Sequence, residues 1–256
     1  MSESMFSVAG QSIVVTGAAS GIGRSIALGL ARSGARVTAS DINAQALEVL
    51  AQEGQTQGLA LVTVQCDVSQ GNEVSRMFEE HSARWGGVDA AFANAGIAGE
   101  LIPATQITLE DVHRVLRVNL DGAFLVARAA VDVMVPQGRG SIVMTSSVWG
   151  ERAFEAPILS YAASKGAISN MVRQFAVELA PTGVRVNGIL PAGIVTAIAD
   201  GFYENREAVA ALAERIPAKR VVSPDAVIGP AQFLASEASA WITGHLLPVD
   251  GGYLAM

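Results

Sequence analysis

The sequence predicts an α/β protein built on a doubly wound parallel sheet. Short apolar runs alternate with segments of helical period along all 256 residues, and each run is continuous rather than alternating in polarity. Continuous apolar strands are what a parallel sheet covered by helices on both faces requires. Alternation of strand and helix over the whole chain is typical of the doubly wound architecture.

Seven continuous apolar runs are the expected strands, at 12–16, 35–40, 59–66, 89–93, 140–146, 184–190 and 245–249. The expected helices lie between them, at 21–33, 43–54, 70–85, 108–135 with a break near 118, 160–180 and 224–236. No run of Pro, Gly, Ser or like charge has the composition of a linker. We therefore expect residues 1–256 to form a single domain.

Composition and charge exclude several classes of protein. Half of the residues are hydrophobic, 16% are charged, and the net charge is -7. This acidic balance disfavours binding to nucleic acid or to an anionic membrane surface. No apolar run approaches the roughly 18 residues of a membrane-spanning helix. We therefore expect a globular protein with a large core that binds neither nucleic acid nor membrane.

Cysteine and histidine usage narrows the chemistry further. Cys66 is the single cysteine, which excludes an internal disulfide, agrees with a reducing compartment and favours a small buried side chain. The first basic residue is Arg24, which argues against a targeting peptide and favours a cytoplasmic location. The three histidines have no metal-binding spacing, so we expect no metal site and a packing or surface position for His81, His113 and His245.

The first expected strand runs into TGAASGIG, residues 16–23, directly before a helix. Glycines at such a turn let the backbone approach a pyrophosphate, and the helix N-terminus supplies free amides and a favourable dipole. The glycine spacing is G-x-x-x-G-x-G, and an ordinary tight turn is the alternative interpretation. The position between strand and helix favours nucleotide binding.

Asp41 stands at the end of the second expected strand. A carboxylate there can accept two hydrogen bonds from the adenosine ribose and would repel the additional phosphate of NADP. Neither Ser20 nor Ile42 is an Arg or Lys that could hold that phosphate. The sequence therefore favours NAD, with helix capping by Asp41 alone as the alternative.

Tyr161 and Lys165 lie four residues apart in YAASK, within an expected helix. Residues at this spacing share a helix face, so the phenol and the ammonium can be neighbours. A fixed positive charge lowers the pKa of a nearby tyrosine, which suits proton transfer. The alternative is a packed ring beside a solvated amine.

In this order, the motifs resemble those of the short-chain dehydrogenase/reductases over essentially the whole chain. TGAASGIG is similar to the cofactor loop of that family, NAG at 94–96 to its strand-four motif, and YAASK to its Tyr-x-x-x-Lys signature. ITGHLLPVDGG at 242–252 is similar to its C-terminal segment. The resemblance implies a Rossmann-type fold, a nicotinamide cofactor, and interconversion of a secondary alcohol and its ketone.

The resemblance also implies four catalytic residues. Tyr161 would be the general acid/base, and Lys165 would tune it and hold the nicotinamide ribose. Asn119 would anchor a water-linked proton relay to the lysine. Ser147 would orient the substrate, with Ser146 as the second choice for this role.

Further residues are implied at the cofactor. Asp67 and Val68 would contact adenine, residues 94–96 would form a wall beside the sheet, and Thr196 would contact the nicotinamide amide with Ile194 behind the ring. The full set is Gly17, Ser20, Gly21, Ile22, Gly23, Asp41, Ile42, Asp67, Val68, Asn94, Ala95, Gly96, Tyr161, Lys165, Pro191, Gly193, Ile194 and Thr196.

The chain departs from the family pattern at two places. Pro191-Ala192-Gly193 replaces an adjacent Pro-Gly pair, which leaves the backbone path beside the nicotinamide open, and the loop at 150–160 is slightly longer than common. Trp149 is the expected pocket wall, and 196–217 resembles the variable substrate lid. Some residues in these two segments either face substrate or serve as solvated or packing residues, namely Glu151, Arg152, Phe154, Glu155, Phe202 and Tyr203.

The expected function is NAD-dependent oxidation of a secondary alcohol or reduction of its ketone. A sugar or polyol, a small cyclic or aromatic ketone and a 3-oxoacyl thioester remain open as substrates. A noncatalytic NAD-binding sensor or scaffold is the alternative. An epimerase or dehydratase that recycles its NAD is the third hypothesis. The resemblance implies a homotetramer, with a dimer as the second possibility.

Overall fold

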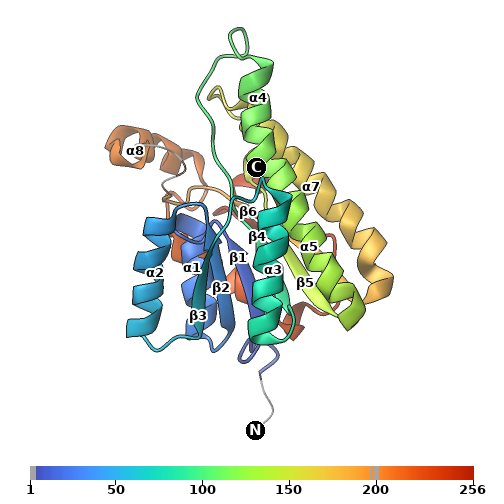
Figure 1. Ribbon diagram of the computed structural model, residues 1–256. Helices are drawn as coiled ribbons and strands as arrows, with labels where there is room; N and C mark the ends of the chain where they lie inside the picture. Colours follow the sequence, from blue (N-terminus) through green and yellow to red (C-terminus); the bar gives the residue numbers. More distant parts are fainter. Residues whose placement is uncertain (1–3, 197, 199–201) are drawn as a thin grey trace.

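The structure, a computed structural model, describes residues 4–196, 198 and 202–256 (Figure 1). Within these residues the strands form one parallel sheet in the order β3-β2-β1-β4-β5-β6-β7. The strands are β1 Ser12–Thr16, β2 Arg36–Asp41, β3 Leu61–Gln65, β4 Ala90–Ala93, β5 Gly140–Thr145, β6 Val184–Pro191 and β7 Leu246–Val249. The predicted doubly wound α/β fold is therefore confirmed.

Helices connect successive strands. The α-helices are α1 Gly21–Arg32, α2 Ala44–Thr56, α3 Gly71–Trp85, α4 Leu109–Leu116, α5 Gly122–Gln137, α6 Val148–Glu151, α7 Leu159–Leu179, α8 Arg206–Arg215 and α9 Ile228–Ala235. The break expected near 118 is a π-helical turn over Arg117–Asp121. The sequence reading missed α8 and α6, and the expected helix at 224–236 begins as a 3-10 turn over Pro224–Val227.

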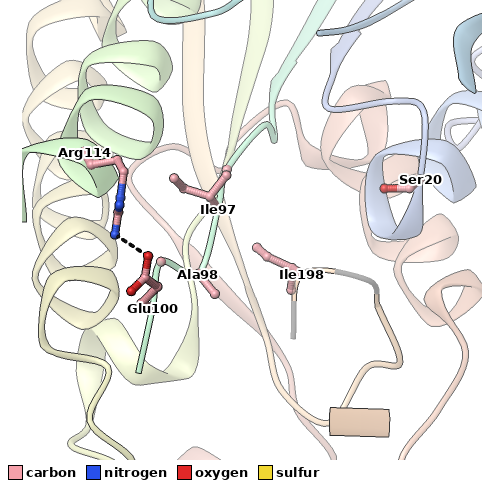
Figure 2. A pocket seen from close by; sticks show the side chains of 8 residues that line it. Ser20, Ile97, Ala98, Glu100, Arg114 and Ile198 are labelled. Carbon is pink, nitrogen blue, oxygen red and sulfur yellow. Dashed lines mark hydrogen bonds and ion pairs between the residues drawn. The ribbon is translucent and has the colours of Figure 1, made fainter. Parts of the chain in front are cut away.

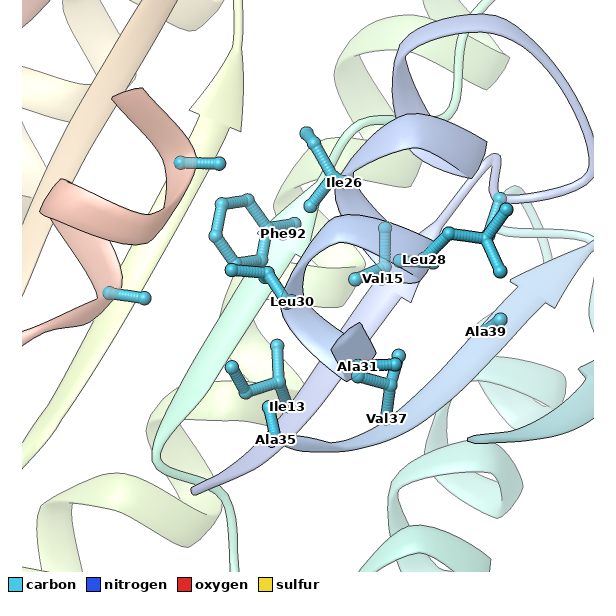
Figure 3. Packing of buried hydrophobic residues seen from close by; sticks show 14 of the residues in the cluster. Ile13, Val15, Ile26, Leu28, Leu30, Ala31, Ala35, Val37, Ala39 and Phe92 are labelled. Atoms are coloured by element: carbon cyan, nitrogen blue, oxygen red, sulfur yellow. The ribbon is translucent and has the colours of Figure 1, made fainter. Parts of the chain in front are cut away.

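The two faces of the sheet contribute to two different hydrophobic clusters. Ile13 and Val15 of β1 pack with Ile26 and Leu30 of α1 and with Phe92 of β4 (Figure 3). Adjacent residues of a strand point to opposite faces. Val14, between Ile13 and Val15, therefore belongs to the second cluster, which α3, α5 and α7 cover. This double coverage is the physical reason for the continuous apolar strands.

The strand order places the site. The chain proceeds from β1 outward to β3 and then returns to β4 on the other side of β1. At such a reversal the loops after the two adjacent strands separate and leave a crevice at the carboxyl ends of the strands. The turn that follows β1 and the segment that follows β4 therefore border one crevice. No helix in the described part of the chain is long and apolar enough to cross a membrane.

Cys66 is buried, as predicted, and His81 takes the packing position rather than the surface position of the two that the sequence left open. Burial raises the pKa of the Cys66 thiol to about 11, with Glu73 acting in the same direction. His81 lies on α3, with Nδ1 2.7 Å from Thr38 Oγ1 of β2. Burial lowers the pKa of His81 from 6.5 to about 4. The imidazole is therefore a neutral packing group that joins α3 to the sheet.

We expect His81 to make stability dependent on pH. The unfolded chain binds a proton at this residue below pH 6.5, whereas the folded chain does so only near pH 4, so the free energy of unfolding falls as pH drops through this window. The full loss is about 3 kcal/mol. Urea denaturation from pH 7 to 4 measures it. A His81→Asn variant should show a shallower decline than wild type, while the exposed-site variant His113→Asn should follow wild type. Equal slopes for wild type and His81→Asn would contradict this account.

Candidate active site

The turn after β1 allows an unusually close backbone approach. Gly17 has φ 64°, and a Cβ there would lie 2.7 Å from the Cα of Ala95. A Cβ on Gly23 would overlap the carbonyl oxygen of Gly17. Ser20 occupies the N-cap position of α1 without a side-chain capping bond. The first amides of α1 and the Ser20 hydroxyl thus border the crevice, a cradle that fits a dinucleotide pyrophosphate.

Asp41 ends β2 and ties the glycine turn to it. Its Oδ2 accepts a hydrogen bond from the Ala19 amide at 3.0 Å, and its Oδ1 accepts one from the Asn43 amide at 3.0 Å. Asn43 caps α2, because its side chain accepts from the Ala46 amide at 3.1 Å. The interpretation of Asp41 as a helix cap alone is therefore wrong. Ile42 is 62% exposed next to this carboxylate.

The segment after β3 lies beside Asp41. The Cys66 amide donates to the Asp41 carbonyl at 3.0 Å, which aligns the two strand ends. Asp67 Oδ1 accepts from the Ser69 amide at 2.9 Å, and Val68 is buried against Gly122. Asp67 and Val68, expected at adenine, thus share one end of the crevice with the carboxylate expected at the ribose.

Asn94 joins three strand ends. Its Nδ2 donates to the Thr16 carbonyl at 3.0 Å, and its Oδ1 accepts from Thr145 Oγ1 at 3.0 Å. The amides of Asn94 and Ala95 donate to Thr16 Oγ1 at 3.1 and 3.3 Å. The position of a Cβ on Gly96 is 3.6 Å from Lys165 Nζ. The NAG segment therefore leads from the glycine turn to the lysine.

Asn119 is fully buried in the π-helical turn. Its Oδ1 accepts from the Ile97 amide at 2.8 Å, and its Nδ2 donates to the Ile97 carbonyl at 2.9 Å and to Ser164 Oγ at 3.0 Å. Both amide hydrogens are thus committed to the segment after β4 and to α7. This side chain fixes the geometry around the lysine, and a relay through Asn119 would use its main chain. π-turns are frequent at functional sites.

Lys165 and Tyr161 lie on one face of α7, as their spacing predicts. Lys165 Nζ is 5.5 Å from the centroid of the tyrosine ring and donates to the Thr145 carbonyl at 2.7 Å. Lys165 is 2% exposed, and burial lowers its pKa to about 8. The ammonium therefore lies within the protein and close to the phenol.

The pKa of Tyr161 differs from the expectation. Burial raises it to about 12, a hydrogen bond with Ser147 acts in the opposite direction, and Tyr203 raises it further. The expected lowering is therefore wrong for the groups that the chain itself supplies, because loss of water around the phenolate outweighs its neighbours. At neutral pH these groups hold Tyr161 as a protonated phenol.

The two adjacent serines have different environments. Ser146 Oγ donates to the Lys165 carbonyl at 2.7 Å and lies 2.8 Å from Ser169 Oγ, so it joins β5 to α7. Ser147 caps α6, accepts from the Trp149 amide at 3.3 Å, and shares a hydrogen bond with Tyr161. The hydroxyl beside the phenol is that of Ser147, which favours it over Ser146 for substrate contact.

The inserted Ala192 is accommodated after β6. Gly193 has φ 59°, its carbonyl accepts from the Val222 amide at 2.9 Å, and Ile194 forms a β-bridge with Val222. A Cβ on Gly193 would overlap the side chain of Ile216. The segment beyond Pro191 then passes the glycine turn. Thr196 lies beside Gly21, because a Cβ on Gly21 would be 3.3 Å from Thr196 Cγ2.

A cavity of about 570 Å³ lies between the glycine turn and the segment after β4. Figure 2 shows Arg114 of α4 and Glu100 paired at one side, 3.2 Å apart, opposite Ser20 and Ile198. The sequence reading missed Ile97, Ala98, Gly99, Glu100 and Arg114 as lining residues. The position directly after a central parallel strand is the signal that could have indicated residues 97–100.

Two ion pairs and one hydrogen bond join the end of α6 and the loop after it to other parts of the chain. Glu151 pairs with Arg173 at 3.3 Å, Arg152 donates to the Met256 carbonyl at 2.9 Å, and Glu155 pairs with Arg215 at 2.6 Å. These contacts favour a structural role for the three charged side chains over substrate recognition.

The Trp149 ring stacks on the Phe154 ring and is T-shaped to the Tyr161 ring. Its role as a pocket wall stays a prediction. Tyr203 is partly buried against the cluster that contains Leu212. Of the expected lid, residues 197 and 199–201 and the side chain of Phe202 lie outside the described residues.

Comparisons with known proteins identify the family of the chain. A family model described as enoyl-(acyl carrier protein) reductase matches residues 17–254. The crystal structure of a short-chain type dehydrogenase/reductase from Mycobacterium marinum is 34% identical, with a TM-score of 0.93 over 98% of each chain. The chain belongs to the short-chain dehydrogenase/reductase family. As a short-chain dehydrogenase/reductase it is an oxidoreductase of the nicotinamide-dependent class, as its motifs implied.

Relatives of this short-chain dehydrogenase/reductase include sugar and polyol enzymes. The 5-keto-D-gluconate 5-reductase of Escherichia coli K12 is 36% identical over 98% of each chain. The D-threitol dehydrogenase of Mycolicibacterium smegmatis is 36% identical over 97% of this chain and 94% of its own. A gluconate 5-dehydrogenase from Burkholderia cenocepacia, crystallised with NADP and tartrate, is 34% identical with a TM-score of 0.92 over 98% of each chain.

The buried ammonium of Lys165 should lower stability at neutral pH. Its pKa is 10.5 in the unfolded chain and about 8 in the folded one, so stability rises with pH between these values. We expect Lys165→Met to be more stable than wild type at pH 7 by about 2 kcal/mol, after loss of the bond to Thr145. Guanidinium denaturation at pH 7 and 10 measures the difference, which should shrink at pH 10. Lys219→Met, at an exposed site, is the control. A Lys165→Met protein less stable than wild type at pH 7 would contradict the argument.

Proposed function

We propose that this protein is an NAD-dependent oxidoreductase that interconverts a secondary alcohol of a sugar, sugar acid or polyol and its ketone. The observation that carries the proposal is the convergence of Ser147, Tyr161 and Lys165 at the carboxyl ends of the central strands, beside the glycine turn. The polyhydroxy substrate class rests on the relatives named for keto-gluconate and threitol.

Residues of the crevice would hold the cofactor. The glycine turn and the N-terminus of α1 would bind the pyrophosphate, Asp41 the adenosine ribose, and residues 94–96 and Thr196 the nicotinamide end. When bound, the nicotinamide supplies or accepts the hydride at the reacting carbon. The overlap of any Cβ at Gly23 with the Gly17 carbonyl supports this assignment, because the tight turn keeps the first amides of α1 uncovered.

Side chains of the protein would donate and accept the proton. In ketone reduction the protonated phenol of Tyr161 donates its proton to the carbonyl oxygen as negative charge develops there. The Ser147 hydroxyl donates a second hydrogen bond to that oxygen. Lys165, with its ammonium 5.5 Å from the ring centroid, stabilises the phenolate that results. In alcohol oxidation the same groups act in reverse.

We propose NAD rather than NADP as the cofactor. The Asp41 carboxylate, held by two backbone amides, occupies the place where an additional ribose phosphate would bring negative charge. Its exposed neighbour Ile42 offers no positive charge. The gluconate 5-dehydrogenase crystallised with NADP makes NADP the alternative.

The proposal includes a homotetramer, with a dimer as the second possibility. Phe124 of α5 and Val177 of α7 are 45% and 74% exposed, and the Phe124 and Phe175 rings are 6.2 Å apart, so apolar surface spans both helices. Residues 1–256 would act as one domain, with 196–217 as a lid over the substrate. The unpaired, buried Cys66 agrees with a cytoplasmic location.

Loss of the phenol should abolish turnover without loss of cofactor binding. We expect Tyr161→Phe and Ser147→Ala to lower kcat at least about 100-fold. Ser146→Ala should keep clearly more activity than Ser147→Ala and lose about 1 kcal/mol of stability. NADH formation over a panel of polyols and sugar acids measures activity, and NADH fluorescence measures binding. A Tyr161→Phe protein as active as wild type would refute the mechanism. Wild type that binds NADH and oxidises nothing in the panel would favour a sensor.

Removal of the Asp41 charge should shift the cofactor preference. We expect Asp41→Asn to raise the ratio of kcat/KM for NADP to that for NAD about tenfold or more, since a like-charge repulsion is removed. Glu48→Gln, an exposed carboxylate on the adjacent helix α2, should leave the ratio unchanged. Steady-state kinetics with both cofactors measure the ratio. Preference for NADP in the wild type would overturn the choice of NAD.

A further inference from the structure

Arg215 joins helix α8 to the loop after α6. Arg215, in the last turn of α8, donates from Nη2 to Glu155 Oε1 at 2.6 Å. Its guanidinium carbon also lies 5.3 Å from the centroid of the Phe154 ring. A planar guanidinium can combine an ion pair with an aromatic contact, which an ammonium does less well. Arg215 is therefore attached to two consecutive residues of one loop.

Aromatic contacts continue from this loop to the proposed acid/base. The Phe154 ring stacks on Trp149 with centroids 4.8 Å apart and an interplanar angle of 27°. The Trp149 ring meets Tyr161 edge-on, with centroids 6.4 Å apart and an angle of 66°. The Trp149 amide also donates to Ser147 Oγ. One run of contacts thus leads from α8 to both proposed catalytic side chains.

Helix α8 itself is packed on the hydrophobic core. Leu212 of α8 and the adjacent Ile216 belong to a buried cluster with Val148 and Leu190, and Trp149 packs against it. The ion pair itself is exposed, with 40% of the Arg215 side chain and 81% of the Glu155 side chain accessible. Exposed ion pairs contribute little to stability, so the loss of this pair should leave the protein folded.

We propose that Arg215 is a positioning residue that fixes the orientation of Tyr161 through Phe154 and Trp149. The phenol must point at the substrate oxygen for proton transfer, and small errors of placement at a reacting group are costly. With α8 attached to the loop, the Trp149 ring limits rotation of the tyrosine ring. Release of Arg215 frees the loop and the aromatic pair. This role rests on the proposed function of Tyr161.

Trp149 fluorescence tests the contacts independently of catalysis. In a Trp85→Phe/Trp241→Phe background, Trp149 is the single tryptophan. We expect Arg215→Ala to raise acrylamide quenching of Trp149 about twofold through local opening of the loop. Glu155→Gln, which removes the ion pair and keeps the ring contact, should raise it less. Arg206→Ala, at the exposed start of the same helix, is the control and should leave it unchanged.

Kinetics in the natural sequence test the positioning role. We expect Arg215→Ala to lower kcat about tenfold with little change in KM for NAD. Arg215→Lys should give an intermediate loss, and Arg206→Ala none. Unchanged quenching in Arg215→Ala overturns the proposal, and so does increased quenching with an unchanged kcat. If wild type turns over no alcohol, the proposed function fails, and a twofold change in quenching would still establish the contact from α8 to Trp149.

Discussion

Burial of the Lys165 ammonium is the constraint around which the site is arranged. A charge removed from water needs strong acceptors nearby, and the carbonyl of Thr145 at the end of β5 is one of them. The rest of the framework holds this geometry: Ser146 joins β5 to the lysine's own carbonyl, and Asn119 joins α7 to the segment after β4. Several buried polar bonds thus serve to place one amine. Such a site reduces stability for the sake of chemistry.

The environment of Tyr161 and Lys165 favours the neutral form of both side chains. Burial raises the pKa of Tyr161 and lowers that of Lys165, so the low dielectric disfavours both charged forms. The resting protein therefore presents a neutral phenol next to an ammonium that has become easier to deprotonate. A phenol in this state is ready to donate a proton. In the proposed mechanism, proton acceptance requires the phenolate, which the Lys165 ammonium and the positive ring of an oxidised nicotinamide would both stabilise.

The two sides of the crevice are built differently. The side proposed for the cofactor consists of backbone from strand ends, joined by Asn94, Thr16 and Asp41, where a single added methyl group would collide. The side proposed for the substrate consists of α8, the loop after α6 and the C-terminal residues, joined by exposed ion pairs and aromatic contacts. Backbone geometry of the first kind tolerates little change, whereas the second kind can be altered one side chain at a time.

Local patterns in the sequence determined the strands, most helices, the glycine turn and the shared face of Tyr161 and Lys165. Each depends on residues close in the chain: apolar runs for doubly covered strands, and a spacing of four for one helix face. Tertiary structure alone decided the pKa of Tyr161, because burial depends on groups distant in sequence. It also decided the cavity beside Arg114, the hydrogen bond from the Ala19 amide to Asp41, and the attachment of α8 to the loop at Glu155. Those contacts join residues far apart in the chain, whose proximity no local pattern records.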